Sequence, residues 1–161
     1  MSHELIIRNA TEDDVPLILD FIRQLARYER LEQEVVATEE TLRATLFGNP
    51  RFAEVIIGEA NGEAAGFALF FHNFSTFIGR PGIYLEDLFV RSEFRGRGYG
   101  RALLARLAQI AKERNCGRLE WAVLNWNEPA IGFYQNLGAV PMNQWTVYRL
   151  KGKELEELAG V

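Results

Sequence analysis

Cysteine and histidine are scarce in this chain. Cys116 is the only cysteine among 161 residues, and His3 and His72 are the only histidines. A single thiol excludes an intrachain disulfide, and so few sulfur and nitrogen ligands argue against a zinc site, so we expect no metal. No motif spacing supports Ser-His or Cys-His catalysis. Any chemistry is therefore expected to use carboxylates, tyrosine and backbone amides.

Long hydrophobic runs and an excess of basic residues are also lacking. No apolar run approaches the roughly 20 residues of a membrane-spanning helix, and the N-terminal sequence MSHELIIRNATEDD has no signal-peptide pattern. These absences predict a cytoplasmic protein with no membrane partner. The formal net charge of −4 argues against a nucleic-acid partner and favours a cationic substrate.

The composition is that of one ordinary globular domain. Apolar residues make up 48% of the chain and charged residues 25%. The length suits a single core, and no repeat, linker or low-complexity stretch interrupts it. We therefore expect one domain over residues 1–161.

The first half of the chain predicts a strand, two helices and a hairpin. Residues 4–10 form the strand, and Thr11 with Asp14 has the spacing of a capping box, so a helix is expected from there to about residue 30. Thr38 would cap a second helix that Gly48 closes. Strands over 52–60 and 63–71 flank Asn-Gly, which is typical of a tight turn.

The second half predicts a mixed arrangement of strands and helices. After an expected loop over 72–81, residues 82–90 read as a strand, and a helix follows that ends near residues 115–117. We also expect strands over 118–124 and 144–150, a helix from Pro129 to Gly138, and a short helix over 153–159. The fold class is therefore α/β.

The sequence RGRGYG, residues 95–100, joins a strand to a helix. Such a junction presents free N–H groups, and glycines let the backbone curve around an anion. A glycine-rich turn with solvated arginines is an equal alternative from this pattern alone. A dinucleotide fingerprint would need glycine where Arg101 stands, and no Walker Gly-Lys-Ser/Thr occurs. An RNA-binding arginine-glycine box is also disfavoured, because this segment is single and flanked by ordered elements.

Five stretches resemble the GNAT superfamily of N-acetyltransferases, in the family's order. They are LARYERLEQEV, YLEDLFV, RGRGYG, AVLNWNEPAIGFYQNLGA and QWTVYRL. Within the superfamily the chain is similar to the spermidine/spermine and thialysine (diamine) N-acetyltransferases. The resemblance implies a mixed, largely antiparallel central sheet flanked by about four helices, with acetyl-CoA as co-substrate.

The resemblance also implies which residues bind the cofactor. Backbone groups of Leu88, Phe89 and Val90 would align the pantetheine arm like an added strand, and an amide there would polarise the acetyl carbonyl. The pyrophosphate would lie on the segment formed by Arg95, Gly96, Arg97, Gly98, Tyr99, Gly100 and Arg101. The far side of the arm would contact Asn127, Glu128, Pro129 and Ala130.

Tyr134 and Glu86 match the family's catalytic positions. Tyr134 would protonate the departing thiolate, although its spacing from Ile131 and Leu137 alone favours a core aromatic. Glu86 would accept the amine proton, directly or through water. Asp87 follows it on a strand and should face the opposite way, so we expect it to pair with an arginine rather than form a dyad.

Four further residues would line the amine pocket. Tyr28 and Glu29 match family positions at the end of the first helix, where a solvated helix end is the alternative. Trp121 and Trp145 could wall the pocket, although lone tryptophans are more often core.

The expected function is acetyl transfer from acetyl-CoA to a small diamine, polyamine or lysine-like amino acid. The alternative is a non-catalytic coenzyme A or polyamine sensor, and the family resemblance implies a homodimer.

Overall fold

A computed structural model describes residues 4–160 of the chain. By its internal contacts the chain divides into two compact units, Met1–Ala122 and Val123–Val161. The first unit holds the sheet and three α-helices, and the second holds two α-helices.

The first unit is built on a five-stranded sheet in which the strands follow chain order. These strands are β1 (Ile6–Asn9), β2 (Glu54–Ala60), β3 (Glu63–Ser75), β4 (Arg80–Val90) and β5 (Leu119–Trp121). Neighbouring strands are antiparallel except β4 and β5, which are parallel. The expected mixed, largely antiparallel sheet is confirmed.

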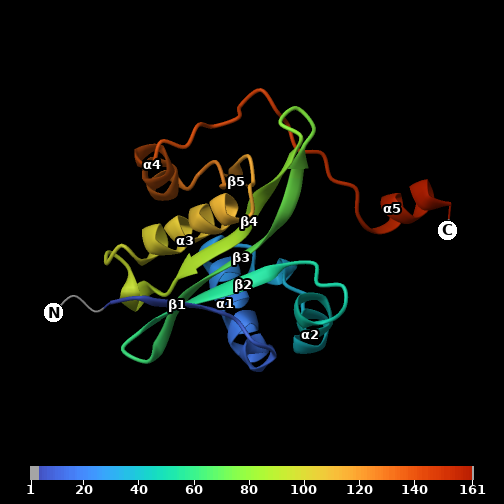
Figure 1. Cartoon of the computed structure of the whole chain (residues 1–161). Coiled ribbons are helices and arrows are strands. Elements are labelled where there is room, and N and C mark those ends of the chain that lie inside the picture. The colour runs from blue at the N-terminus through green and yellow to red at the C-terminus, as the bar shows by residue number, and fades with distance from the viewer. Residues whose placement is uncertain (1–3, 161) are drawn as a thin grey trace. The chain divides into compact units, whose positions relative to one another are not determined.

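Helices cover both faces of this sheet (Figure 1). The helices α1 (Val15–Tyr28) and α2 (Glu39–Phe47) lie on one face, and α3 (Tyr99–Glu113) lies on the other. On the α1 face, the ring of Phe21 stacks on Phe67 with centroids 5.0 Å apart, and Phe89 meets Phe21 edge-on at 6.3 Å. This aromatic cluster fixes α1 over the middle of the sheet, since buried rings dominate core packing.

Local sequence signals place the helix starts and the first hairpin where we expected them. The backbone amide of Thr11 donates to Asp14 at 2.7 Å, and a 3-10 turn over Glu12–Asp14 leads into α1. The Thr38 side chain accepts from the amide of Thr41 at the start of α2. Asn61 and Gly62 have φ angles of 55° and 78°, as a tight turn between antiparallel strands requires.

The loop expected over 72–81 is wrong. β3 continues to Ser75 and β4 starts at Arg80, so only residues 76–79 form the turn, with Gly79 at φ 70°. The polar residues His72 and Asn73 suggested a loop, but they pair with Ile83 and Gly82 across the ladder. Cross-strand hydrogen bonds here outweigh the weak local preference for a loop.

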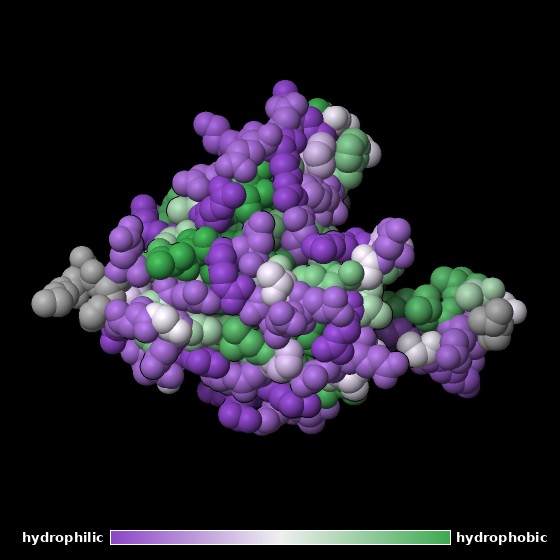
Figure 2. All heavy atoms as spheres, turned by 60° about the horizontal axis from the view of Figure 1, so that its bottom comes forward, coloured by the Kyte–Doolittle hydropathy of each residue, from purple (hydrophilic) through white to green (hydrophobic). Residues whose placement is uncertain are grey.

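The second unit contains α4 (Glu128–Asn136) and α5 (Gly152–Ala159). The strand expected over 144–150 is wrong, because residues 123–160 contain no strand. Trp145 and Tyr148 are 75% and 93% exposed, and Figure 2 shows hydrophobic side chains at the surface of α5 as well. A β-prone sequence forms a strand only where a neighbouring strand supplies hydrogen bonds.

Among residues 4–160, no helix is both long and apolar enough to cross a membrane.

Candidate functional site

One edge of β4 is left without a strand partner over its second half. β5 pairs with β4 only at Ile83, Tyr84 and Leu85, where Leu85 faces Trp121. From Glu86 to Val90, no strand within residues 4–160 pairs with this edge. Unpaired backbone at a sheet edge can hydrogen-bond an extended ligand as an added strand. Leu88, Phe89 and Val90 lie in this open stretch, and the half-buried Trp121 lies where it begins.

A β-bulge lies at the point where the strands separate. Phe70 pairs with Leu85 and Leu69 pairs with Asp87, so Glu86 has no partner on β3. An extra residue of this kind interrupts the alternation of side chains along a strand. Asp87 lies opposite Leu69, which belongs to the hydrophobic cluster under α1. The bulge therefore turns Asp87 towards the α1 face.

Three carboxyl groups interact at this bulge: Glu29, Glu86 and Asp87, here called the acidic cluster. Loss of hydration, reinforced by the charges of Glu86 and Glu29, raises the pKa of Asp87 to about 7. Loss of hydration and the charge of Glu86 also raise the pKa of Glu29. A cationic ligand here would relieve the repulsion between these carboxylates.

The expected pairing of Asp87 with an arginine is wrong. Asp87 forms no ion pair with any residue of the described range 4–160, and no cation contributes to its raised pKa. The bulge invalidates the regular alternation on which that expectation rested. Sequence reasoning therefore missed Asp87 as a member of the cluster, because nothing in the local sequence marks a bulge.

The guanidinium of Arg95 links the open edge of β4 to the end of α1. Arg95 Nε donates to the Val90 carbonyl at 2.9 Å, and the guanidinium lies 5.1 Å from the ring of Tyr28 and 5.4 Å from that of Phe89. Such cation–π contacts hold a guanidinium in a defined place. Tyr28 ends α1 and is followed directly by Glu29. Arg95 therefore contacts the residue that directly precedes Glu29.

Residues 95–101, here called the glycine segment, lead into the N-terminus of α3. Gly96 and Gly98 have φ angles of 76° and 80°, and Gly98 is the N-cap of the helix. A Cβ at Gly96, Gly98 or Gly100 would meet no other atom of the chain within 4 Å. Gly96 and Gly98 thus serve the backbone conformation, and all three glycines leave open space, where free helix amides favour an anion.

The side chains of the glycine segment lie in different surroundings. Arg97 donates to the Glu93 carbonyl at 3.3 Å and lies over the ring of Phe94 at 5.5 Å. Tyr99 is buried and packs on the same phenylalanine, whereas Arg101 is exposed. The segment is therefore anchored by Tyr99, while the Arg101 side chain is open to solvent.

The second unit carries the remaining predicted site residues. Asn127 is buried and caps α4, its side chain accepting from the amide of Ala130 at 3.4 Å. Glu128 and Pro129 form the first turn of α4, and the ring of Tyr134, two turns later, lies 5.5 Å from that of Phe133. Trp145 stands outside any helix or strand. The helix thus brings Tyr134 and the Asn127–Ala130 turn onto one element.

No group of three or more histidine, cysteine, aspartate or glutamate residues in the part of the chain that the structure describes could hold a metal ion.

Comparisons with known proteins all lead to one family. The model of the Acetyltransferase (GNAT) family matches residues 19–139. The thialysine N-epsilon-acetyltransferase of Bos taurus is 39% identical over 97% of this chain and 98% of its own length. The L-ornithine N5-acetyltransferase NATA1 of Arabidopsis thaliana is 33% identical over 94% of this chain and 86% of its own length.

A solved structure shares the fold over the full chain. An integron cassette protein from the mobile metagenome of V. cholerae superposes with a TM-score of 0.82 at 29% identity, covering 100% of this chain and 99% of that one.

Proposed function

This chain belongs to the Acetyltransferase (GNAT) family and is an acetyl-CoA-dependent N-acetyltransferase, and from that premise we propose that it acetylates the side-chain amine of a short lysine-like amino acid such as thialysine. The acidic cluster of Glu29, Glu86 and Asp87 beside the open edge of β4 is the observation that carries this proposal. It supplies a negative site for an ammonium group next to a strand edge that can receive the acetyl donor.

The backbone of β4 and the glycine segment would bind acetyl-CoA. Leu88, Phe89 and Val90 would pair with the pantetheine arm, and the amides from Gly96 to Arg101 would hold the pyrophosphate, with Arg95 reinforcing them. A hydrogen bond to a charged group contributes about 1.5–3 kcal/mol, whereas a helix dipole contributes only ~0.3–1 kcal/mol. Several amides together would therefore outweigh the dipole.

Side chains would carry out the proton transfers of the reaction, from the substrate ammonium and to the departing thiolate. Glu86 would take the proton of the substrate ammonium, directly or through water, so that the neutral nitrogen can attack the acetyl carbonyl carbon. As the C–N bond forms and the C–S bond breaks, an amide of the open β4 edge would stabilise the carbonyl oxygen. Tyr134 would donate its hydroxyl proton to the sulfur, and the second proton of the attacking nitrogen would pass to the resulting tyrosinate, through water, as the amide forms. Asn127 to Ala130 would support the cofactor arm.

The charge distribution near Glu29 favours a short amine over a polyamine. A polyamine carries several charges along its length and needs several spaced carboxylates. Glu32, which could have been one of them, is paired with Arg27 at 2.8 Å. Ser75, the last residue of β3, and Phe77, in the turn that follows, stand where, by resemblance, polyamine enzymes carry an acid and a tryptophan. Phe77 is 99% exposed and offers no charge.

The names of the relatives agree with a lysine-like substrate. Thialysine and L-ornithine, the substrates in the names of two relatives, are amino acids with a side-chain amine. Small diamines and polyamines are the runner-up substrates. The alternative of a non-catalytic sensor is disfavoured, because these relatives are named as transferases.

The pocket would be completed by Tyr28, Trp121 and Trp145. We also propose that residues 1–161 act as one acetyltransferase domain, since the match to the relative from Bos taurus spans 97% of the chain. Cytoplasmic location and a homodimer stay predictions.

A panel of amines tests the proposal. Thiol release from acetyl-CoA should be measured with thialysine, lysine, ornithine, 1,3-diaminopropane, spermidine and spermine, and ranked by kcat/KM. We expect the amino acids to rank first. A kcat/KM for spermidine at least about tenfold above every short amine would contradict the substrate class, and no thiol release with any amine would favour the sensor.

A further inference from the structure

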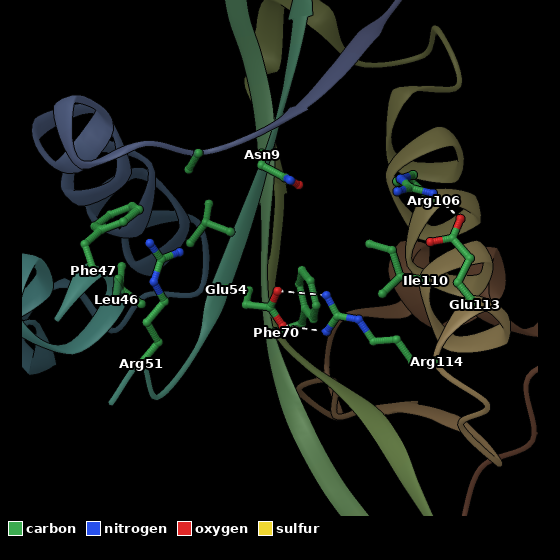
Figure 3. A pocket seen from close by; sticks show the side chains of 12 residues that line it. Asn9, Leu46, Phe47, Arg51, Glu54, Phe70, Arg106, Ile110, Glu113 and Arg114 are labelled. Atoms are coloured by element: carbon green, nitrogen blue, oxygen red, sulfur yellow. Dashed lines mark hydrogen bonds and ion pairs between the residues drawn. The ribbon is translucent and has the colours of Figure 1, made fainter. Parts of the chain in front are cut away.

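A hollow lies at the β1 edge of the sheet, between α2 and α3 (Figure 3). β1 pairs with β2 only at residues 56–59, so the start of β2 at Glu54 has no strand partner on this side. The hollow has a volume of about 140 Å³. None of its lining residues belongs to the acidic cluster, the open β4 edge or the glycine segment.

Arginine side chains outnumber carboxylates in this hollow. Arg114 forms a two-pronged pair with Glu54, with N–O distances of 2.6 and 2.9 Å. Arg106 pairs with Glu113 at 3.0 Å. Hydrogen bonds from Arg114 hold the pKa of Glu54 below its usual range, so this carboxyl is charged at neutral pH. Two of the three guanidiniums are therefore neutralised within the chain.

The third guanidinium, that of Arg51, forms no ion pair within residues 4–160, although its charge also lowers the pKa of Glu54. Arg51 forms no ion pair or hydrogen bond with any residue of the described range 4–160. Its guanidinium lies 5.4 Å from the centre of the Phe47 ring, which orients it without neutralising it. Figure 3 shows Arg51 and Arg114 entering from opposite sides of Glu54. The lining thus carries one uncompensated positive charge, in a chain whose net charge is −4.

We propose that this hollow binds a small organic monocarboxylate, with its carboxylate on the guanidinium of Arg51. The planar fork of a guanidinium matches a carboxylate with two parallel hydrogen bonds. One negative charge balances the lining. The carboxamide of Asn9 also lines the hollow and offers a further donor, while Leu46 and Ile110 offer an apolar wall for the rest of the ligand.

The size of the hollow limits the ligand. A cavity of about 150 Å³ holds a molecule of six heavy atoms such as benzene, and this hollow has a volume of about 140 Å³. A carboxylate with two to four carbons fits that space. Because Arg51 follows α2 and Arg106 belongs to α3, such a ligand would contact the elements on both sides of the sheet edge. Ligand bound to the native state alone stabilises it.

The test is a propionate titration of the full-length ¹⁵N-labelled protein at constant ionic strength. NMR would follow the Nε–H resonances of the arginines, and the Arg51 signal is identified by its loss in Arg51→Gln. We expect a saturable shift of the Arg51 signal. Arg51→Gln should weaken propionate binding, followed on the backbone amides of residues 51–55, by at least about tenfold. The matched control Arg23→Gln, an exposed arginine of α1, should change nothing.

A second variant is expected to change propionate affinity in the opposite direction. Glu54→Gln releases the guanidinium of Arg114 and should tighten propionate binding at least about threefold. A shift that does not saturate, or equal losses in Arg51→Gln and Arg23→Gln, would overturn the proposal. Tighter binding of inorganic phosphate than of propionate would overturn the choice of a carboxylate. Circular dichroism checks that each variant is folded.

Discussion

The acidic cluster and the glycine segment lie near the two ends of the open edge of β4, and they differ in which atoms are available for recognition. At the acidic cluster, carboxylate side chains from a helix end and a bulge interact with one another. At the glycine segment, Gly96 and Gly98 have positive φ angles and open space where a Cβ would stand, so the main chain is accessible. A region that recognises by side-chain charge should be sensitive to loss of one charge, whereas a region that recognises by backbone should be sensitive to an added Cβ.

The largest expected effect on the reaction rate comes from Tyr134. This residue belongs to neither the acidic cluster nor the glycine segment, so its substitution should affect neither amine nor cofactor binding. If it is the general acid, Tyr134→Phe should lower kcat by about 10²–10⁴ while the affinity for acetyl-CoA changes little, since only a hydroxyl is lost. Single-turnover rates and calorimetry measure the two quantities. Near-normal turnover in the folded variant would leave Tyr134 with a packing role.

Glu86→Gln tests the role of the acidic cluster. Removing the proposed base should lower kcat/KM for the amine by about 10² or more, with the KM for acetyl-CoA unchanged. Glu63→Gln, an exposed glutamate at the start of β3, is the matched control and should behave like the parent protein. Equal losses in both variants would show that overall charge, rather than this cluster, attracts the amine.

Gly98→Val tests whether the main chain of the glycine segment binds acetyl-CoA. Valine at a φ of 80° is strained and places atoms in the open space, so loss of one hydrogen bond to phosphate, about 1.5–3 kcal/mol, should weaken acetyl-CoA binding roughly 10- to 100-fold. Arg97→Ala should cost less than about fivefold, because exposed ion pairs contribute only ~0–1 kcal/mol.

Gly62→Val provides a control for strain alone. Gly62 has a φ of 78° in the turn between β2 and β3 and, like Gly98, no neighbouring atom within 4 Å of an added Cβ. The Gly62→Val variant should lose stability as Gly98→Val does, but it should keep its affinity for acetyl-CoA. If calorimetry gives Arg97→Ala the larger loss, side chains rather than amides hold the phosphates.

The smallest expected effect is on stability and comes from Asp87. Its pKa of about 7 in the fold lies above that of an exposed aspartate, so the folded state keeps a proton that the unfolded chain releases between pH ~4 and 7. Stability should therefore fall as pH rises through this range. Asp87→Asn removes the stability loss that comes from ionising Asp87. It should therefore raise the Tm by a few degrees at pH 8, and by less at pH 5.

Thermal unfolding at both pH values measures this difference. Asp13→Asn, at an exposed position before α1, is the control and should show no such gain at pH 8. A larger gain at pH 5 than at pH 8 would contradict the raised pKa of Asp87.

Local signals made much of the fold predictable. Thr38 caps α2 and Asn61-Gly62 turns the hairpin, because each acts through atoms within a few residues of itself. Asn115, at φ 57°, ends α3 near the expected place in the same way. The motifs around Gly98 likewise placed the glycine segment between a strand and a helix.

Features that depend on a distant partner were not predictable. His72 and Asn73 join β3 only because β4 pairs with them, and residues 144–150 form no strand despite their β-prone sequence. The bulge at Glu86 arises from the register between β3 and β4. The acidic cluster follows from that register. The sequence could therefore propose Glu86 for the site, but it could not predict that the Asp87 side chain belongs to the same cluster.

The most direct test of the account is a crossed measurement of both Michaelis constants in Glu86→Gln and Gly98→Val. Initial rates of thiol release would be recorded while acetyl-CoA and thialysine are varied independently. We expect Gly98→Val to raise the KM for acetyl-CoA and to leave the KM for thialysine unchanged. We expect Glu86→Gln to lower kcat/KM for thialysine and to leave the KM for acetyl-CoA unchanged. If both variants change the same constant, the division between an acidic amine site and a backbone cofactor site is wrong.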